Sequence, residues 1–230
     1  MKRILFVAAL ILAAACQREF PEVVRIEGGK LHVQGIARDQ NEEGMYCSFT
    51  SAFFKTDLEG NITGSVTGIN GHLGAMTFDA VGRKVYASLE IKDDEIGKGI
   101  SKTLGAQEHS REQSRFYVAE IDVDKVNGMD IPFDEAVKLH PIDEAGKDNL
   151  AKVTLEGIEA DHRYGCSGID GITIGPAFGS GSRKADHLYV AYGIYGDNKR
   201  TDNDYNIILC YSLHDLSKPV KKLFTLSGNT

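Results

Sequence analysis

A carboxylate and an imidazole have the strongest claim to chemistry in this sequence. Asp170 and His72 lie in two stretches of similar pattern, 168–175 and 72–79. If these stretches form neighbouring strands, the two side chains can meet and take part in a metal or substrate site. Other roles also fit: Asp170 can cap a turn or accept hydrogen bonds from backbone amides, and His72 can bond to the backbone of a neighbouring strand.

A second ionisable group precedes Cys166 and contains Glu159, Asp161, His162 and Arg163. We expect Asp161 and His162 to lie on the ligand-binding face. An acid/base role would require burial that raises a carboxylate pKa, and a solvated loop is the alternative. Cys166 has a histidine nearby, as a nucleophile needs, but no catalytic motif surrounds it.

A short loop is crowded with side-chain oxygens from Asp197, Asn198, Asp202, Asn203 and Asp204. Such loops can bind calcium, so a divalent cation such as calcium is a candidate cofactor. The ordered spacing and central glycine of an EF-hand are absent, however. The same residue types also favour turns.

An internal repeat positions these residues. Residues 32–39 align with 72–79 at an offset of 40 residues, and at that offset Tyr46 falls on Tyr86. A third copy starts at 168, with its tyrosine at position 189. Asp170 therefore aligns with Gln34 and Gly74. Each copy predicts a short apolar strand, a turn, and a second strand centred on tyrosine.

Two more strands follow each pair. Third strands are expected at 52–58, 115–123 and 206–213, and fourth strands at 61–67, 136–142 and 219–226. Helical periodicity is weak, with one candidate helix near 143–152. Four short strands recurring at about 40 residues are typical of propeller blades. We therefore predict an all-β chain of about three β-propeller blades, each of four antiparallel strands, in an incomplete ring.

Three blades leave apolar faces open, because a ring needs about four to eight. The chain is therefore expected to be a piece of a longer protein, or to pair with a second copy into a six-blade ring. The expected organisation is a signal peptide at 1–15, a tether and possible closing strand at 16–30, blade 1 at 31–69, blade 2 at 71–142 with an insertion at 91–114, a connecting loop at 143–166, and blade 3 at 167–227. The long loops fall on one face, which is the expected ligand face.

The N-terminus resembles a bacterial lipoprotein signal. Lys2 and Arg3 precede an apolar run over 4–12, and small residues lead to Cys16. The resemblance implies that Cys16 is lipidated and holds the protein on a membrane of the cell envelope, in the periplasm or at the outer-membrane surface. An ordinary secreted protein with a free Cys16 is the alternative.

The charge and the cysteines limit which partners and which cross-links are expected. The net charge of −7 has acidic and basic residues interspersed, which argues against nucleic acid as a partner. No second apolar stretch approaches twenty residues, so no membrane span is expected. Cys47 and Cys210 lie in apolar strand-like runs, which favours buried thiols over a disulfide.

Residues 35–46 and 54–61 resemble an NHL-type blade, and the wider resemblance is to six-bladed, TolB-like propellers, which include the gluconolactonase-like enzymes. That resemblance implies a metal-binding carboxylate at Asp170 and a cation that activates water. The family's acidic residue near the mature N-terminus has no match here. We therefore expect a module that binds a small molecule, glycan or protein; the alternatives are a divalent-metal-dependent lactonase- or esterase-like hydrolase and a structural role in an envelope complex.

Overall fold

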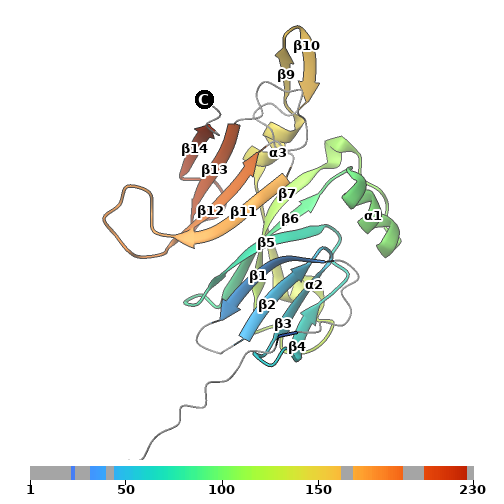
Figure 1. The fold of residues 1–230 in the computed structure, drawn as a ribbon, viewed down its shortest axis with the longest axis vertical. Helices are drawn as coiled ribbons and strands as arrows, with labels where there is room; N and C mark the ends of the chain where they lie inside the picture. Colours follow the sequence, from blue (N-terminus) through green and yellow to red (C-terminus); the bar gives the residue numbers. More distant parts are fainter. Residues whose placement is uncertain (1–21, 24–31, 40–43, 162–167, 194–204, 227–230) are drawn as a thin grey trace, which may run out of the picture.

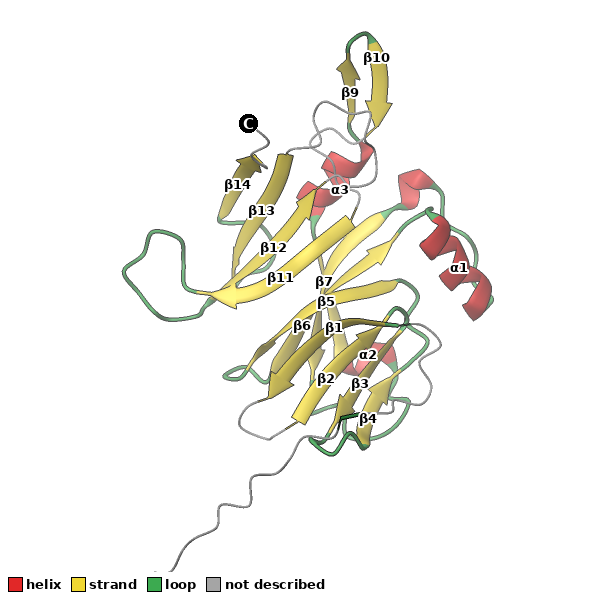
Figure 2. Ribbon diagram, viewed as in Figure 1, coloured by secondary structure: helices red, strands yellow, loops and turns green. Residues whose placement is uncertain are grey.

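Three four-stranded antiparallel sheets form the framework of the described chain in a computed structural model (Figures 1 and 2). The structure describes residues 22–23, 32–39, 44–161, 168–193 and 205–226. In each sheet the strands follow one another in chain order, and the three described sheets do not form a closed ring. The prediction of an all-β fold built of propeller blades is confirmed. We call the sheets blade 1, blade 2 and blade 3.

The strands match the expected ones to within a few residues. Blade 1 contains β1 (Val33–Asp39), β2 (Gly44–Phe49), β3 (Ala52–Thr56) and β4 (Ile62–Val66). Blade 2 contains β5 (His72–Asp79), β6 (Lys84–Ile91), β7 (Arg115–Asp122) and β8 (Val137–Pro141). Blade 3 contains β11 (Gly168–Gly175), β12 (His187–Gly193), β13 (Tyr205–Ser212) and β14 (Lys221–Leu226).

Strand register confirms the repeat. Tyr46 pairs with Ala37, Tyr86 with Thr77, and Tyr189 with Thr173, so the three tyrosines occupy matching places on second strands. The first strand of every blade also carries a register shift at the same place, beside residue 34, 74 or 170. Such a bulge redirects a side chain. The alignment that paired Asp170 with Gln34 and Gly74 is therefore reproduced in three dimensions.

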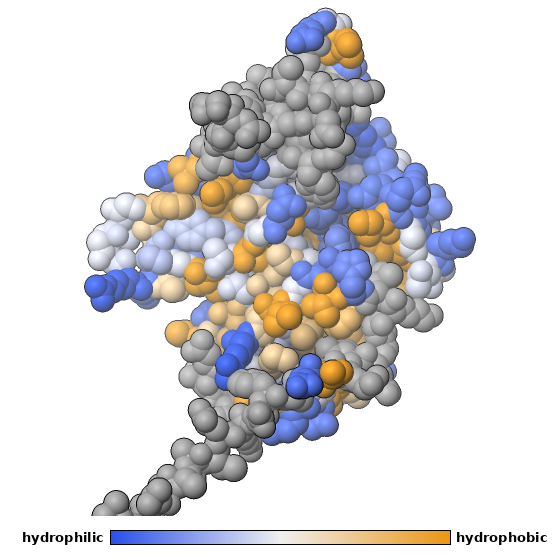
Figure 3. Space-filling view, viewed as in Figure 1, coloured by the Kyte–Doolittle hydropathy of each residue, from blue (hydrophilic) through white to orange (hydrophobic). Residues whose placement is uncertain are grey.

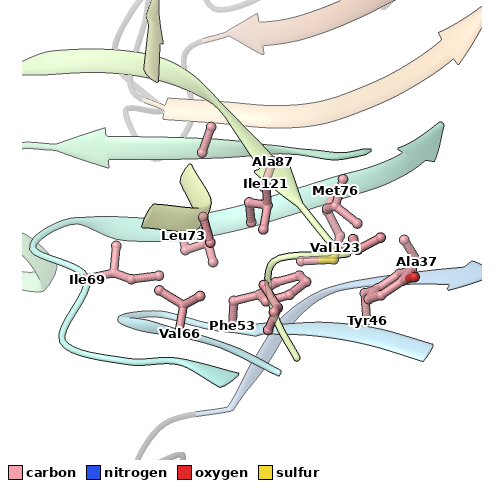
Figure 4. Packing of buried hydrophobic residues seen from close by; sticks show 14 of the residues in the cluster. Ala37, Tyr46, Phe53, Val66, Ile69, Leu73, Met76, Ala87, Ile121 and Val123 are labelled. Atoms are coloured by element: carbon pink, nitrogen blue, oxygen red, sulfur yellow. The ribbon is translucent and has the colours of Figure 1, made fainter. Parts of the chain in front are cut away.

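Successive blades bury their apolar faces against each other. We call the side of a blade that faces the next blade its forward face, and the opposite side its backward face. Tyr46 and Phe53 on the forward face of blade 1 pack against Leu73 and Ile121 of blade 2 (Figure 4). The same arrangement joins blade 2 to blade 3, through a core formed by Tyr86, Phe116, Val118, Leu188, Val190 and Leu209.

The first strands approach most closely at glycine. A Cβ on Gly35 would lie 2.6 Å from the carbonyl oxygen of Gly74, so only glycine fits there. Ser48 Oγ donates a hydrogen bond of 2.7 Å to that same oxygen. The contacts run from β1 to β5 and from β5 to β11, which makes the first strands the inner edge of the arc (Figure 1).

The insertion at 91–114 differs from the expected loop because it folds into helix α1 (Glu95–Leu104) and a short 3-10 turn, η1 (Arg111–Gln113). Asp94 caps the helix by accepting a 2.8 Å hydrogen bond from the Gly97 amide. Gly105 ends it in the left-handed region, at φ 64°. A carboxylate before the helix and a glycine after it are the sequence signals that predict these two ends.

The remaining elements lie between blades 2 and 3 or within blade 2. Helix α3 (Asp143–Leu150) forms where a helix was expected, and it is followed by a hairpin of β9 (Lys152–Leu155) and β10 (Ile158–Asp161) in the segment expected to be a connecting loop. The one-turn helix α2 (Phe133–Ala136) precedes β8. None of these helices, nor α1, is long and apolar enough to cross a membrane.

Cys47 and Cys210 are buried free thiols, as expected. Burial raises the pKa of the Cys47 thiol, which makes it less reactive. The expectations for the signal peptide at 1–15, for Cys16, for the closing strand and for the oxygen-rich loop concern residues outside the described ones, apart from residues 22–23.

Candidate functional site

A buried ion pair lies at the inner edge of blade 2. Glu90 is near the end of β6 and Lys92 directly follows it; their exposed fractions are 5% and 8%. Lys92 Nζ lies 2.8 Å from Glu90 Oε2 and 3.0 Å from Asp94 Oδ2. Removing these charges from water is costly, and the close contacts between opposite charges offset that cost.

Glu90 also joins two blades. Its Oε1 accepts a hydrogen bond from the backbone amide of Ile169, which is on β11 of blade 3. Because Ile169 directly precedes Asp170, this bond fixes the backbone at the start of the bulge that carries Asp170. The carboxylate of Glu90 thus holds Lys92 with one oxygen and blade 3 with the other.

The structure places His72 and Asp170 around this ion pair. His72 is opposite Glu90 in the β5–β6 register. Burial lowers the pKa of His72, against the opposing effect of Glu90, and its buried Nε2 has no hydrogen-bond partner among the described residues. Burial, together with repulsion from Glu90, raises the pKa of Asp170. Both residues therefore respond to the same buried charges.

The lowered pKa of His72 makes stability depend on pH. The folded protein releases the His72 proton more readily than the unfolded chain, whose histidine titrates near 6.5. The unfolded state therefore binds more protons as the pH falls through that value. We expect the free energy of unfolding, measured by urea titration, to fall from pH 7.5 to pH 5.5. His72→Gln should reduce this fall and the exposed control Val81→Ala should keep it; equal falls in all three proteins would contradict the assignment.

Sequence analysis missed Glu90, Lys92 and Asp94. The signal was present, because Glu90 and Lys92 are two residues apart at the end of a strand, and side chains at that spacing share one face. Two opposite charges on the buried face of an apolar strand indicate an ion pair. The apolar pattern of residues 84–91 predicts a core strand, and it does not by itself mark the two charges at the end of that strand.

Asp161 and His162 are not brought to this cluster by the described backbone. Asp161 ends β10, and the β9–β10 hairpin projects beyond α3, away from β5 and α1 (Figure 1). His162 lies outside the described residues. The expectation that a metal site includes Asp170 also finds no co-ligands in the described ranges, where no three His, Cys, Asp or Glu side chains are grouped to hold a metal ion.

A cleft of about 570 Å³ lies between α1 and blade 1. Ile96, Ile100 and Leu104 of α1 form one apolar wall, and Phe49 and Ala52 contribute to the other. Ile96 is 49% exposed, although it is a large apolar side chain. Figure 3 shows hydrophobic surface at α1 and over the inner strands. Clefts of this size and character hold small molecules in many proteins.

Polar groups lie at one end of the cleft. His32 and Gln34 belong to its lining, with Gln34 Nε2 3.0 Å from His32 Nε2 and 3.3 Å from Thr50 Oγ1. The charge of His32 acts on His72, and Glu95 of the cleft directly follows Asp94 of the ion-pair cluster. The cleft and the cluster are therefore adjacent parts of one face.

Comparison with known proteins gives remote likenesses only. The chain matches no protein-family model and no curated protein. Among solved structures it is similar to the apo form of the soluble aldose sugar dehydrogenase from Escherichia coli, with 10% identity, a TM-score of 0.40, and coverage of 78% of this chain and 44% of that one.

Two further solved structures are similar to this chain over most of its length. The Dos1 propeller has 9% identity and a TM-score of 0.35, covering 85% of this chain and 47% of that one. A eukaryotic initiation factor has 11% identity and a TM-score of 0.26, covering 91% and 47%. The chain spans less than half the length of these three proteins. The fold assignment rests on the three four-stranded sheets themselves, and their arrangement is that of a β-propeller module.

Proposed function

We propose that this chain is a cell-envelope lipoprotein whose propeller blades bind a ligand on the face that carries α1. The observation that supports this proposal is the cleft between α1 and blade 1, with apolar walls and hydrogen-bonding groups at one end. Blade 1 supplies a rigid wall through β2 and β3, while α1 belongs to an insertion between strands. Rigid scaffolds with elaborated loops are where binding sites usually form.

The lining favours an uncharged or weakly cationic ligand with an apolar body. Among the described residues of the cleft, Glu95 and His32 are the ionisable ones, and neither lysine nor arginine contributes. An anion would therefore find no opposite charge in the lining. Gln34, Thr50 and His32 can donate to or accept from a polar group at one end.

Filling the cleft should weaken binding. Gly99 lines the cleft from α1, and a Cβ there would meet no atom within 4 Å. Gly99→Leu is expected to occupy the cleft and weaken binding of the neutral fluorophore N-phenyl-1-naphthylamine at least about tenfold, which corresponds to about 1.4 kcal/mol. The change also replaces a helical glycine, so the helix should not be weakened. Fluorescence titration measures the dissociation constant.

Gly146→Leu is the matched control, because Gly146 is in helix α3 and also has no atom within 4 Å of an added Cβ. It should leave fluorophore binding unchanged. If both variants bind equally well, the fluorophore binds elsewhere and the proposed site is wrong. Loss in Gly99→Leu alone assigns the binding to the cleft.

Envelope anchoring is the second part of the proposal and rests on the sequence around Cys16. Expression in a bacterial host with labelled palmitate should give a labelled protein in the membrane fraction. Cys16→Ser should carry no label and leave the membrane fraction, because the thiol that receives the acyl chains is gone. Equal labelling of the two proteins would contradict lipidation at Cys16.

A metal-dependent hydrolase is the alternative function for the same face, and Asp170 is the carboxylate that carries it. Asp170 is an exposed residue, and partial loss of water around its carboxyl, together with repulsion from Glu90, raises its pKa. Further metal ligands would have to come from outside the described residues. Stoichiometric divalent cation that is lost in Asp170→Ala, together with hydrolysis of a lactone panel, would favour the enzyme over the binding module.

A further inference from the structure

The same tyrosine position has different surroundings in the three blades. Tyr46 of blade 1 and Tyr86 of blade 2 are 1% and 5% exposed, because the next blade covers each of them. Tyr189 holds the equivalent place on the forward face of blade 3 and is only half-buried. It borders an open concavity of about 700 Å³.

The concavity on the forward face of blade 3 is mostly apolar, and Lys221 Nζ lies at its edge, 5.8 Å from the centroid of the Phe178 ring. The described lining of the concavity includes Tyr189, Ala191 and Ile208 together with glycines and small polar residues, and no ionisable group other than Tyr189 belongs to it. Phe178 stands at its edge, 51% exposed, with its ring 4.9 Å from that of Tyr189 in an edge-on contact. Blade 2 covers the forward face of blade 1 and blade 3 covers that of blade 2, whereas no blade formed by the described residues covers this one.

The backward face of blade 1 has the complementary feature on its inner strand. Ile36 and Val33 are 60% and 41% exposed. Their equivalents in the repeat are Met76 and Leu73 of blade 2, and Ile172 and Ile169 of blade 3, which are all between 0% and 8% exposed. Preceding blades cover those residues. On the outer strands of blade 1, Cys47 and Phe54 are already buried, so the open part of this face is the inner strand β1.

We propose that two copies of this chain close into a six-blade ring, in which the forward face of blade 3 of each copy receives β1 of the other. The contact would repeat the packing that already joins β1 to β5 and β5 to β11. Each copy carries both halves of the contact, so a twofold operation uses both open faces at once. Six blades fall within the range in which propellers close.

The close approach at Gly35 predicts which residues meet in the contact between the two copies. Within the chain, Gly35 packs against the backbone of Gly74. In the repeat, Gly171 is equivalent to Gly35, and Gln34 is equivalent to Gly74. Gly171 is therefore expected to pack against Gln34 of the second copy. Within one copy, a Cβ on Gly171 would meet only the Cβ of Ala191, at 3.6 Å.

The first test is the mass of the full chain in solution, with Cys16→Ser to prevent lipidation. Sedimentation should give two copies of the 25.1 kDa chain. Gly171→Glu should weaken the dimer at least about tenfold, because it buries an unpaired charge in the contact, while an added side chain has room in the single copy. Val81→Glu is the control, since Val81 is 96% exposed and lies in the turn between β5 and β6 of blade 2, which contributes neither open face.

The second test is cross-linking by a short bismaleimide, with the chain lacking an added cysteine as the background. Gly171→Cys mixed with Gln34→Cys should give a covalent dimer, whereas each variant alone should not exceed the background. A monomeric chain at 100 µM, or a dimer unaffected by Gly171→Glu, would overturn the proposal. Cross-linking of Gly171→Cys to itself would overturn it in favour of two blade 3 faces meeting. Fluorophore binding is measured separately on the chain without an added cysteine, because Gln34 belongs both to the cleft lining and to the proposed contact. Gly171→Glu leaves the cleft lining intact, so it tests the dimer apart from the cleft.

Discussion

Phe53→Ala should lower the free energy of unfolding by about 3–5 kcal/mol. Phe53 is fully buried in the core between blades 1 and 2, and its ring stacks on that of Tyr46 with a centroid distance of 5.9 Å. Removing the ring leaves a cavity that strand backbones cannot close. Because domains are stable by only about 5–15 kcal/mol, this single change should remove a large fraction of the total.

Urea denaturation followed by circular dichroism measures the effect. Val81→Ala is the control, because Val81 is 96% exposed and its truncation should change stability by less than about 0.5 kcal/mol. A loss below about 1 kcal/mol in Phe53→Ala would mean that the forward face of blade 1 does not pack on blade 2 in solution.

The second large effect should come from Glu90→Ala. The variant removes the carboxylate that lies 2.8 Å from the buried Lys92 Nζ, and it removes the acceptor of the Ile169 amide. Removing one partner of a buried pair typically costs about 3–5 kcal/mol, because the other charge stays buried. Glu90→Gln should lose less, since its amide oxygen can still accept from the Ile169 amide.

A double variant separates the ion pair from simple loss of volume. Glu90→Ala combined with Lys92→Met should be more stable than Glu90→Ala alone, because the buried ammonium is removed and Asp94, which loses this partner, has a side chain that is 40% exposed to water. Glu95→Ala is the surface control: its contact with Lys98 is exposed, with 94% of the Glu95 side chain accessible, and such pairs contribute little. If the loss of stability in the double variant equals the sum of the losses in Glu90→Ala and in Lys92→Met alone, the two residues do not act as a pair.

The strands could be predicted from the sequence because each strand of one blade is supported by its equivalents in the other two. Matching Tyr46 to Tyr86 fixed one strand in two blades at once, and Tyr189 extended the match to a third. Period-two patterns and polar turns then located the strands around them. Blade packing was inferable for the same reason, since sheets with two apolar faces must be covered on both sides.

Helix α1 and the buried cluster were harder to predict, for different reasons. The helix is short and contains two glycines, Gly97 and Gly99, which weaken its periodic signal. Its ends were still marked by Asp94 and Gly105. The Glu90–Lys92 pair depends on which strand face is buried, and this is decided by a blade far along the chain. The spacing of Glu90 and Lys92 indicates a shared face but cannot show that water is excluded from it.

Asp170 and His72 were chosen from alignment with the repeat, and the structure places both beside one ion pair. Asp161 was chosen from local charge density, which is high in any solvated hairpin. An equivalent position in a repeat predicts where a residue lies in the fold, whereas a run of charged residues predicts only that their side chains are exposed to solvent.

Asp94 has two partners that belong to different parts of the molecule, and this creates a thermodynamic linkage. One carboxylate oxygen holds the first turn of α1 and the other holds Lys92, whose partner Glu90 grips the Ile169 amide. Whatever displaces α1, including an occupant of the neighbouring cleft, must alter how firmly that amide is held, and the influence is reciprocal. Hydrogen exchange at the Ile169 amide is therefore a remote reporter of events at α1.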